Sequence, residues 1–244
     1  MAIRLDAFLS HRGFGSRSHV REIIRKGRVT VGGVVCRGHG EHVAERPVCV
    51  DGQLIAVGVT EATLILNKPL GCSCSHDAAE APLLEELVPA EYRHLPMEPA
   101  GRLDRDTSGL LIVTSEGDLI HSLTNPRRHL EKRYRVGYRG TLSSHAVQRC
   151  AKGIDMEGDP RPTLPARLEL EAASADGLEH ATLHLHEGRY HQVRRMFAAL
   201  GGEVITLHRD RIGMLELPND LAAGASRIIT ADELGLLTQT VPVA

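Results

Sequence analysis

The stretch around which this chain is organised reads GRLDRDTSGLLIVT and spans residues 101–114. Its second half is apolar and rich in β-branched residues, which predicts a buried strand. Its first half places four charges between two glycines, and a charged loop beside a buried strand is a common location for chemistry. Arg102 and Arg105 bracket Asp104, so we expect this carboxylate to stay ionised and held in place. A solvated turn with local ion pairs is the alternative interpretation of this loop.

The composition predicts a folded protein without a membrane span or an export signal. The chain has 244 residues, 42% of them hydrophobic, enough for one large domain or for a medium domain and a small one. No apolar run approaches the roughly 18 residues that cross a bilayer. Residues 1–6 contain no apolar signal core, so we expect a cytoplasmic protein. Cys72 and Cys74 have no matching second pair, and we predict no metal site.

The distribution of charge predicts a nucleic-acid partner although the net charge does not. The whole chain carries −2, but residues 1–50 carry +5 and the remainder carries −7. A basic module joined to a nearly balanced one is typical of a docking domain followed by a catalytic domain.

The first fifty residues predict two short helices and a hairpin. Apolar residues at helical spacing predict a helix over residues 4–10, and Ser16 is a good cap for a second helix. Arg17, Arg21 and Arg25 step by four, so they share one helical face and should point outward. Two β-type runs around Gly32-Gly33 predict a hairpin with a tight turn.

The rest of the chain predicts alternating strands and short helices. Strands are expected over residues 63–68, 131–138 and 182–186, and short helices near residues 83–87 and after Ser115. In the strand over 131–138, Tyr134 should share a face with Val136, opposite the cations of that strand. His184, His186 and His191 invite a metal hypothesis, but the polar face of an exposed strand is the better interpretation.

A second informative stretch, EGRYHQVRRMFAALGG, spans residues 187–202. Its apolar residues fall at the i, i+3, i+4, i+7 positions of a packed helix over residues 193–200. Arg194 lies at the edge of that apolar stripe, from which an arginine can reach into a cleft. Beyond it, residues 204–207 predict a strand with a basic end, and Thr230 opens a capping box for a last helix.

These motifs resemble two known families in a fixed order. RLDAFL at residues 4–9 and the run from Ser16 to Gly33 resemble the S4 RNA-binding domain. NKP, GRLDRDTSGL, EKRY and GRYHQVRRM follow in order and resemble the pseudouridine synthases of the RsuA/RluB group, which act on ribosomal RNA. The resemblance implies an α+β protein: an S4-like domain (residues 1–53), a linker (54–62) and a catalytic domain (63–244) whose mixed, mostly antiparallel sheet is flanked by helices.

The resemblance also implies roles for individual residues. Asp104 matches the catalytic aspartate, Tyr134 the tyrosine that stacks on the target base, and Arg194 the basic residue paired with the aspartate. Arg102 matches the arginine that helps to fill the space left by the flipped base. Further RNA contacts are expected at Lys68, Arg105, Arg189, His191 and Gln192, and in the basic module at Arg4, Arg17, Arg21, Arg25, Lys26 and Arg28.

The expected reaction turns uridine into pseudouridine in ribosomal RNA, with small-subunit (16S) rRNA the most similar case. No group is lost and no electrons are transferred, so no cofactor and no metal is expected. The partner would be ribosomal RNA or an assembling subunit, and the protein a monomer. The alternatives are a large-subunit (23S) rRNA synthase, a non-catalytic RNA-binding assembly factor, and a glycosidase using Asp104 and Asp106 as its carboxylate pair.

Overall fold

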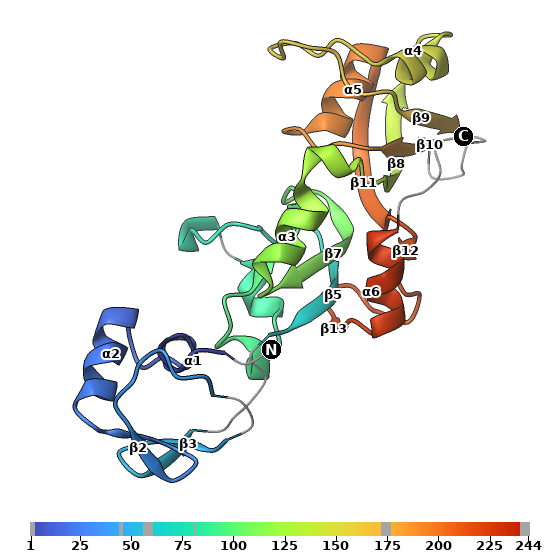
Figure 1. Ribbon diagram of the computed structural model, residues 1–244. Coiled ribbons are helices and arrows are strands. Elements are labelled where there is room, and N and C mark those ends of the chain that lie inside the picture. Colours follow the sequence, from blue (N-terminus) through green and yellow to red (C-terminus); the bar gives the residue numbers. More distant parts are fainter. Residues whose placement is uncertain (1–2, 44–45, 56–60, 81, 172–176, 240–244) are drawn as a thin grey trace. The chain divides into compact units, whose positions relative to one another are not determined.

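The computed structural model describes residues 3–43, 46–55, 61–80, 82–171 and 177–239 (Figure 1). Two compact units make up the chain. The first contains Met1–Ala62 and Val88–Met97, and the second contains Thr63–Leu87 and Glu98–Ala244. In the described part of the chain, no helix combines the length and the apolar character needed to cross a bilayer.

The N-terminal unit packs two helices onto a small sheet. Helices α1 (Leu5–His11) and α2 (Arg17–Arg25) each turn an apolar stripe toward one core, and the Ser16 hydroxyl caps α2 by accepting from the His19 amide. Burial of each large apolar side chain stabilises the fold by about 1.5–3 kcal/mol. The helical core residues are Leu5, Phe8, Leu9, Val20, Ile23 and Ile24.

The small sheet is antiparallel, with the order β2-β1-β3-β4. Strands β1 (Val29–Val31) and β2 (Val34–Cys36) form the expected hairpin, because Gly32 and Gly33 adopt positive φ angles of 61° and 81° that a tight turn requires. Strands β3 (Val48–Val50) and β4 (Gln53–Ile55) complete it. Leu54 and Ile55, placed in the linker by the sequence, therefore belong to a paired strand, while residues 56–60 lie outside the described residues.

The C-terminal unit is built on a mixed sheet of nine strands among the described residues. Seven of them follow the order β13-β5-β7-β11-β8-β10-β9, and the other two are β6, which pairs with β7, and β12, which pairs with β11. All pairs are antiparallel except β7 with β11. The predicted mixed, mostly antiparallel sheet is confirmed. The strands are β5 (Thr63–Lys68), β6 (Glu98–Pro99), β7 (Ser108–Thr114), β8 (Lys132–Gly140), β9 (Arg167–Leu170), β10 (Glu179–Leu185), β11 (Gly202–Ile212), β12 (Leu215–Glu216) and β13 (Ser226–Ile228).

Short helices flank this sheet (Figure 1). Helix α5 buries Val193, Met196, Phe197 and Leu200, as the spacing predicted, and the Phe197 ring lies 5.2 Å from that of Tyr138 in β8. The helices are α3 (Gly117–Thr124), α4 (Ala146–Lys152), α5 (Gln192–Leu200) and α6 (Ala231–Thr238), with 3₁₀ turns at Ala78–Glu80, Leu84–Leu87 and Pro126–Arg128. A further 3₁₀ turn, Ala90–Tyr92, belongs to the first unit. The predicted capping box opens α6.

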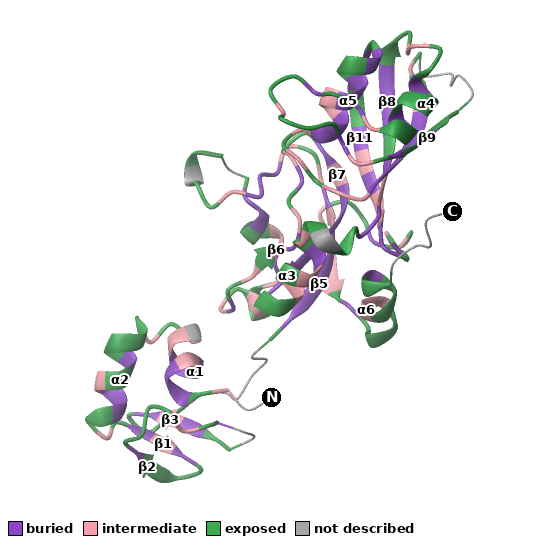
Figure 2. Ribbon diagram, turned by 45° about the horizontal axis from the view of Figure 1, so that its top comes forward, coloured by how far each residue is buried: buried purple, intermediate pink, exposed green. Residues whose placement is uncertain are grey.

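Strand β7 is the buried centre of the unit, as expected (Figure 2). Six of its seven residues are buried, because β5 and β11 pair with it on either side. In β8, Tyr134, Val136 and Tyr138 are buried, while Arg133 and Arg135 lie on the other face and pair with Asp210.

Strand β11 is longer than the sequence indicated. The expected strand over residues 204–207 with a basic end is an eleven-residue strand, Gly202–Ile212. Its charged residues stay in the ladder because β8 pairs with nearly its whole length, with two register shifts. Partners from distant segments thus override the weak local strand signal.

Gly109 should be essential for folding. Its φ angle is +110°, and a Cβ atom there would lie 2.2 Å from the backbone oxygen of Arg209 in the parallel partner strand. We expect Gly109→Ala to lower the free energy of unfolding by about 3 kcal/mol or more, from backbone strain and overpacking together. Urea unfolding measures the change.

Gly117→Ala is the matched control for this variant. Gly117 begins α3, and a Cβ atom there meets nothing within 4 Å. We expect this change to be neutral or to stabilise by up to about 1 kcal/mol. Equal urea midpoints for the two variants would contradict the steric argument.

Candidate active site

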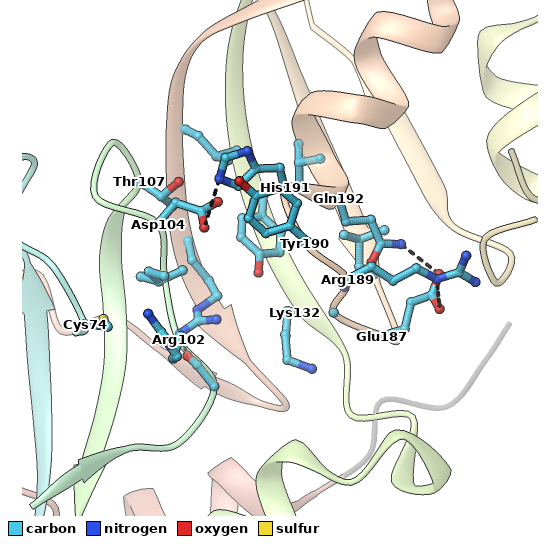
Figure 3. A pocket seen from close by; sticks show the side chains of 18 of the residues that line it. Cys74, Arg102, Asp104, Thr107, Lys132, Glu187, Arg189, Tyr190, His191 and Gln192 are labelled. Carbon is cyan, nitrogen blue, oxygen red and sulfur yellow. Dashed lines mark hydrogen bonds and ion pairs between the residues drawn. The ribbon is translucent and has the colours of Figure 1, made fainter. Parts of the chain in front are cut away.

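A cavity of about 850 Å³ opens in the C-terminal unit, lined mainly by three segments and also by residues of the segment 73–80 and of β11 (Figure 3). One segment is the loop 101–107 before β7, the second runs from the end of α3 into β8, and the third is the loop 185–191 with the start of α5. The cavity therefore gathers the two sequence stretches singled out above. Asp104, Tyr134, His191 and Arg194 all line it.

The loop 101–107 is held from beneath by a buried lysine. Lys68 is fully buried, and its ammonium donates to the carbonyl oxygens of Pro69, Asp104 and Thr107 at 3.1, 3.0 and 2.9 Å. Burial lowers the pKa of Lys68 below its usual value. Lys68 has no exposed surface, and two of the three carbonyl oxygens that it binds belong to the loop. Its buried position argues against a direct contact with RNA, which stays a prediction.

A buried arginine holds the same loop from the other side. Arg209 in β11 is 1% exposed and donates to the carbonyl oxygens of Leu110 and Gly101 at 2.9 and 3.0 Å. In the sequence, Arg209 is recognisable only as part of the basic end of a strand. No local pattern distinguishes it, since the groups that it binds lie about a hundred residues earlier in the chain.

The Asp104 carboxylate faces the cavity without a close cation. Its side chain is 37% exposed, and Oδ1 lies 3.6 Å from Nε2 of His191. The family resemblance predicts Arg194 as its partner. Instead, Arg194 pairs with the Asp106 carboxylate at 2.8 Å and also donates to the backbone oxygens of Asp106 and Val204.

The position of Arg194 on α5 explains why it pairs with Asp106 and not with Asp104. Arg194 lies in the first turns of α5, and its hydrogen bond to the Val204 carbonyl in β11 directs the guanidinium to the far end of the loop, at Asp106. Arg194 therefore ties the loop to α5 and β11, and leaves the Asp104 carboxylate open to a ligand.

Arg102 and Arg105 are exposed at the cavity, as a role in RNA contact requires. Arg105 donates from Nε to the Gly71 carbonyl at 2.9 Å. Tyr134 is buried in β8 and lines the cavity, so only part of its ring is accessible from within. Lys132, two residues earlier, also lines it, because alternate residues of a strand share a face.

Lys132 should make stability rise with pH. Burial, with the positive charge of Arg209, lowers the pKa of Lys132 from 10.5 to about 8 in the folded protein. Between these pH values the unfolded chain binds the proton and the folded protein does not. The free energy of unfolding should therefore increase by up to about 3 kcal/mol from pH 8 to 10.5. Urea unfolding of the wild type against Lys132→Met tests this, and parallel pH profiles would contradict it.

The motif GRYHQ contains two side chains that bind other protein groups, Arg189 and Gln192, and two that are accessible at the cavity, Tyr190 and His191. Arg189 pairs with Glu187 and Asp159 and donates to the carbonyls of Arg161 and Pro162, at 2.7–3.1 Å. Gln192 is 4% exposed and bonds the Glu187 carboxylate. Protein groups thus occupy the polar atoms of Arg189 and Gln192, although both residues line the cavity, and their RNA contacts stay a prediction.

The predicted RNA-contact residues of the N-terminal unit are all on its surface, and several are neutralised. Arg4 and Arg21 both pair with the buried carboxylate of Asp6, at 3.1 and 3.0 Å. Lys26 pairs with Glu22, and Arg28 with Asp51. Arg17 and Arg25 are exposed on α2.

The histidines do not form a metal site. His184 is buried against Glu131, which also pairs with Arg211, so the expected exposed polar face is wrong for His184. His186 bonds the backbone oxygen of His129, and His191 lies by Asp104. Within the described residues, no three His, Cys, Asp or Glu side chains are grouped as a metal site requires.

Comparison with known proteins identifies the family. A family profile described as RNA pseudouridylate synthase matches residues 62–199, more than half of the chain, and an S4 domain profile matches residues 3–44. The chain belongs to the RNA pseudouridylate synthase family. The predicted family and the predicted pair of domains are confirmed, and the protein is an enzyme of this class.

Relatives of this synthase match it along nearly its whole length. "Ribosomal small subunit pseudouridine synthase A" of Yersinia pestis is 39% identical and is matched over 95% of this chain and 97% of its own. The proteins of the same name from Pasteurella multocida and Escherichia coli K12 are each 37% identical, over 95% of this chain and 98% of theirs. A crystal structure titled pseudouridylate synthase, 34% identical, matches with a TM-score of 0.66 over 97% of this chain and 100% of that one.

Proposed function

We propose that this synthase isomerises a uridine of small-subunit ribosomal RNA to pseudouridine. Full-length relatives carry the name of that activity, and each is covered over nearly its whole length. The observation that supports a reaction at one nucleotide is the position of Asp104, whose carboxylate is 37% exposed in a cavity of about 850 Å³ that the largely buried Tyr134 also lines. The RNA, free or in an assembling subunit, is bound by a monomer in the cytoplasm.

Asp104 is the catalytic residue in this proposal. The N1–C1′ bond breaks, the uracil turns, and a C5–C1′ bond forms, after which the C5 proton leaves to solvent. An ionised carboxylate serves this reaction in either of two ways: it adds to C1′ as a nucleophile, or it takes the C2′ proton to give a glycal. The open face of Asp104 leaves room for the sugar. RNA that covers the cavity would exclude the water that could hydrolyse the intermediate.

The remaining cavity residues bind and position the RNA. A stacked uridine cannot be attacked, so it is first turned out of the helix at a cost of a few kcal/mol. Tyr134 offers the ring on which the extruded uracil stacks, and Arg102 occupies the space that the base leaves. Arg105 and His191 add contacts at the rim. Arg194 acts through the loop, because it holds Asp106 while the carboxylate two residues earlier remains available.

The N-terminal unit supplies affinity through phosphate contacts. Arginine side chains on a rigid helix match phosphate oxygens two at a time but carry little sequence information. We assign this role first to Arg17 and Arg25, whose guanidinium groups are exposed on α2. Arg4, Arg21, Lys26 and Arg28 contribute secondarily, because each already shares a carboxylate with the protein.

Tritium release tests the proposed function directly. Purified protein is incubated with 16S rRNA, 23S rRNA or partly assembled small subunits, each labelled with tritium at C5 of uridine. Formation of the C5–C1′ bond expels that hydrogen, so release from 16S rRNA or the small subunit is the expected result. Release from 23S rRNA alone would make this a large-subunit enzyme. Tight binding without release from any RNA would make it an assembly factor.

A further inference from the structure

We propose that Tyr190 and His191 form a seat for a nucleobase that flanks the target uridine in the RNA. The two rings stack with their centroids 3.9 Å apart and their planes at 14° (Figure 3). Tyr190 is 76% exposed and lines the cavity. The imidazole of His191 covers one face of the phenol ring, and the rest of the ring remains accessible. An exposed aromatic face beside the site of a base-flipping reaction is suited to stack a second base.

The backbone at His191 is strained, and this strain accompanies the stacked arrangement of the two rings. His191 adopts a left-handed backbone conformation, with φ at +48° and ψ at 33°, which is rare for a residue other than glycine. Such strain persists where the surroundings enforce it and is concentrated at ligand sites. Here the residues on either side of the Tyr190–His191 pair fix the backbone, because Arg189 and Gln192 both donate to the Glu187 carboxylate. The ring pair is thereby preorganised rather than ordered by the ligand.

The position of the stack distinguishes it from the seat of the target base. Nε2 of His191 lies 3.6 Å from the Asp104 carboxylate, so the stack borders the proposed reaction centre. Tyr134, to which the target uracil is assigned, is by contrast buried in β8. Two aromatic seats at different depths fit an RNA in which one base is buried for reaction and its neighbour is held at the rim. The chain has only four Tyr, three Phe and no Trp, and Tyr134 and Tyr190 are the two tyrosines among the residues that line this cavity.

This inference rests on the proposed function, and it is tested by combining protein variants with altered RNA substrates. The RNA is a 16S fragment with tritium at C5 of the modified uridine, used intact or with an abasic residue on its 5′ or its 3′ side. The proteins are the wild type, Tyr190→Ala and Tyr190→Phe. Leu170→Ala is the control, because Leu170 is 52% exposed on β9 and does not line the cavity. Single-turnover tritium release and the dissociation constant are both measured.

On intact RNA, Tyr190→Ala should weaken binding about 5- to 150-fold, the range for loss of one base–aromatic stack. Tyr190→Phe and Leu170→Ala should stay within about twofold of the wild type, because the first keeps the ring and the second lies elsewhere. On one of the two abasic RNAs, Tyr190→Ala and the wild type should bind equally. Urea midpoints equal to the wild type show that all variants are folded.

Two results would overturn the inference: intact RNA bound equally by Tyr190→Ala and the wild type, or a Tyr190→Ala loss of the same size on both abasic RNAs. The second result would place the target base itself, or the loop conformation, under Tyr190. Failure of the proposed function looks different, because the wild type would then release no tritium from any RNA. The dissociation constants, with the abasic residue beside each uridine in turn, would still decide whether the seat exists.

Discussion

Asp104→Asn should reduce single-turnover tritium release by about 10⁴-fold or more, while the dissociation constant for RNA stays within about twofold. The amide keeps the size and most of the hydrogen bonding of the carboxylate but neither attacks C1′ nor accepts a proton. The carboxylate is 37% exposed, and the hydrogen bonds from Lys68 reach the backbone oxygen of residue 104 and not the side chain. Folding should therefore be unaffected, and an unchanged urea midpoint checks this.

Asp106→Asn is the matched control, two residues along the same loop. Asp106 is bound by Arg194, so its loss should loosen the loop and slow the reaction about tenfold, far less than the loss of Asp104. A glycosidase would use both carboxylates as an acid–base pair and would lose its activity in either variant. Equal losses in the two variants would therefore contradict the assignment of Asp104 as the single catalytic carboxylate. An Asp104→Asn protein that keeps its activity would contradict it outright.

Lys68→Met should show the largest effect on stability among the residues around the cavity. The methionine fills most of the space but removes the ammonium donor from the carbonyl oxygens of Pro69, Asp104 and Thr107, of which the Asp104 oxygen keeps the Thr107 amide as a donor at 3.1 Å. Loss of the donor to such a buried cluster should lower the free energy of unfolding by about 3–5 kcal/mol. The released loop should also lower activity at temperatures at which the variant remains folded, because Asp104 is no longer held in position.

Lys152→Met controls for the loss of a lysine as such. Lys152 is exposed at the end of α4, so its replacement should change the free energy of unfolding by no more than about 0.5 kcal/mol. Urea unfolding of both variants, with tritium release measured at low temperature, separates the two effects of Lys68. A Lys68→Met protein as stable as the wild type but weak in RNA binding would restore the direct RNA contact that the buried position argues against.

The sequence predicted those parts of the fold that depend on short-range spacing. The stripes of α2 and α5, the Ser16 cap, the Gly32-Gly33 hairpin and the buried strand β7 are each specified within about ten residues, so their patterns can be read locally. The ordered motifs likewise predicted the family and placed the GRLDRD loop and the GRYHQ segment in one site. Helix α4 and the length of β11 were missed, because their stability comes from neighbours and not from their own periodicity.

Only the tertiary structure decided which charged groups meet. Arg194 is 88 residues from Asp106, and Lys68 is 36 residues from Asp104, so nothing in the local sequence tells which acid or carbonyl each cation will reach. An arginine guanidinium can pair with either acid of the loop, and in the structure Arg194 is bound to the Val204 carbonyl and pairs with Asp106. Tertiary packing likewise determined that Arg189 and Gln192 of GRYHQ bind protein groups while Tyr190 is exposed at the cavity. Residue type determines what a side chain can bind, and packing determines what is within its reach.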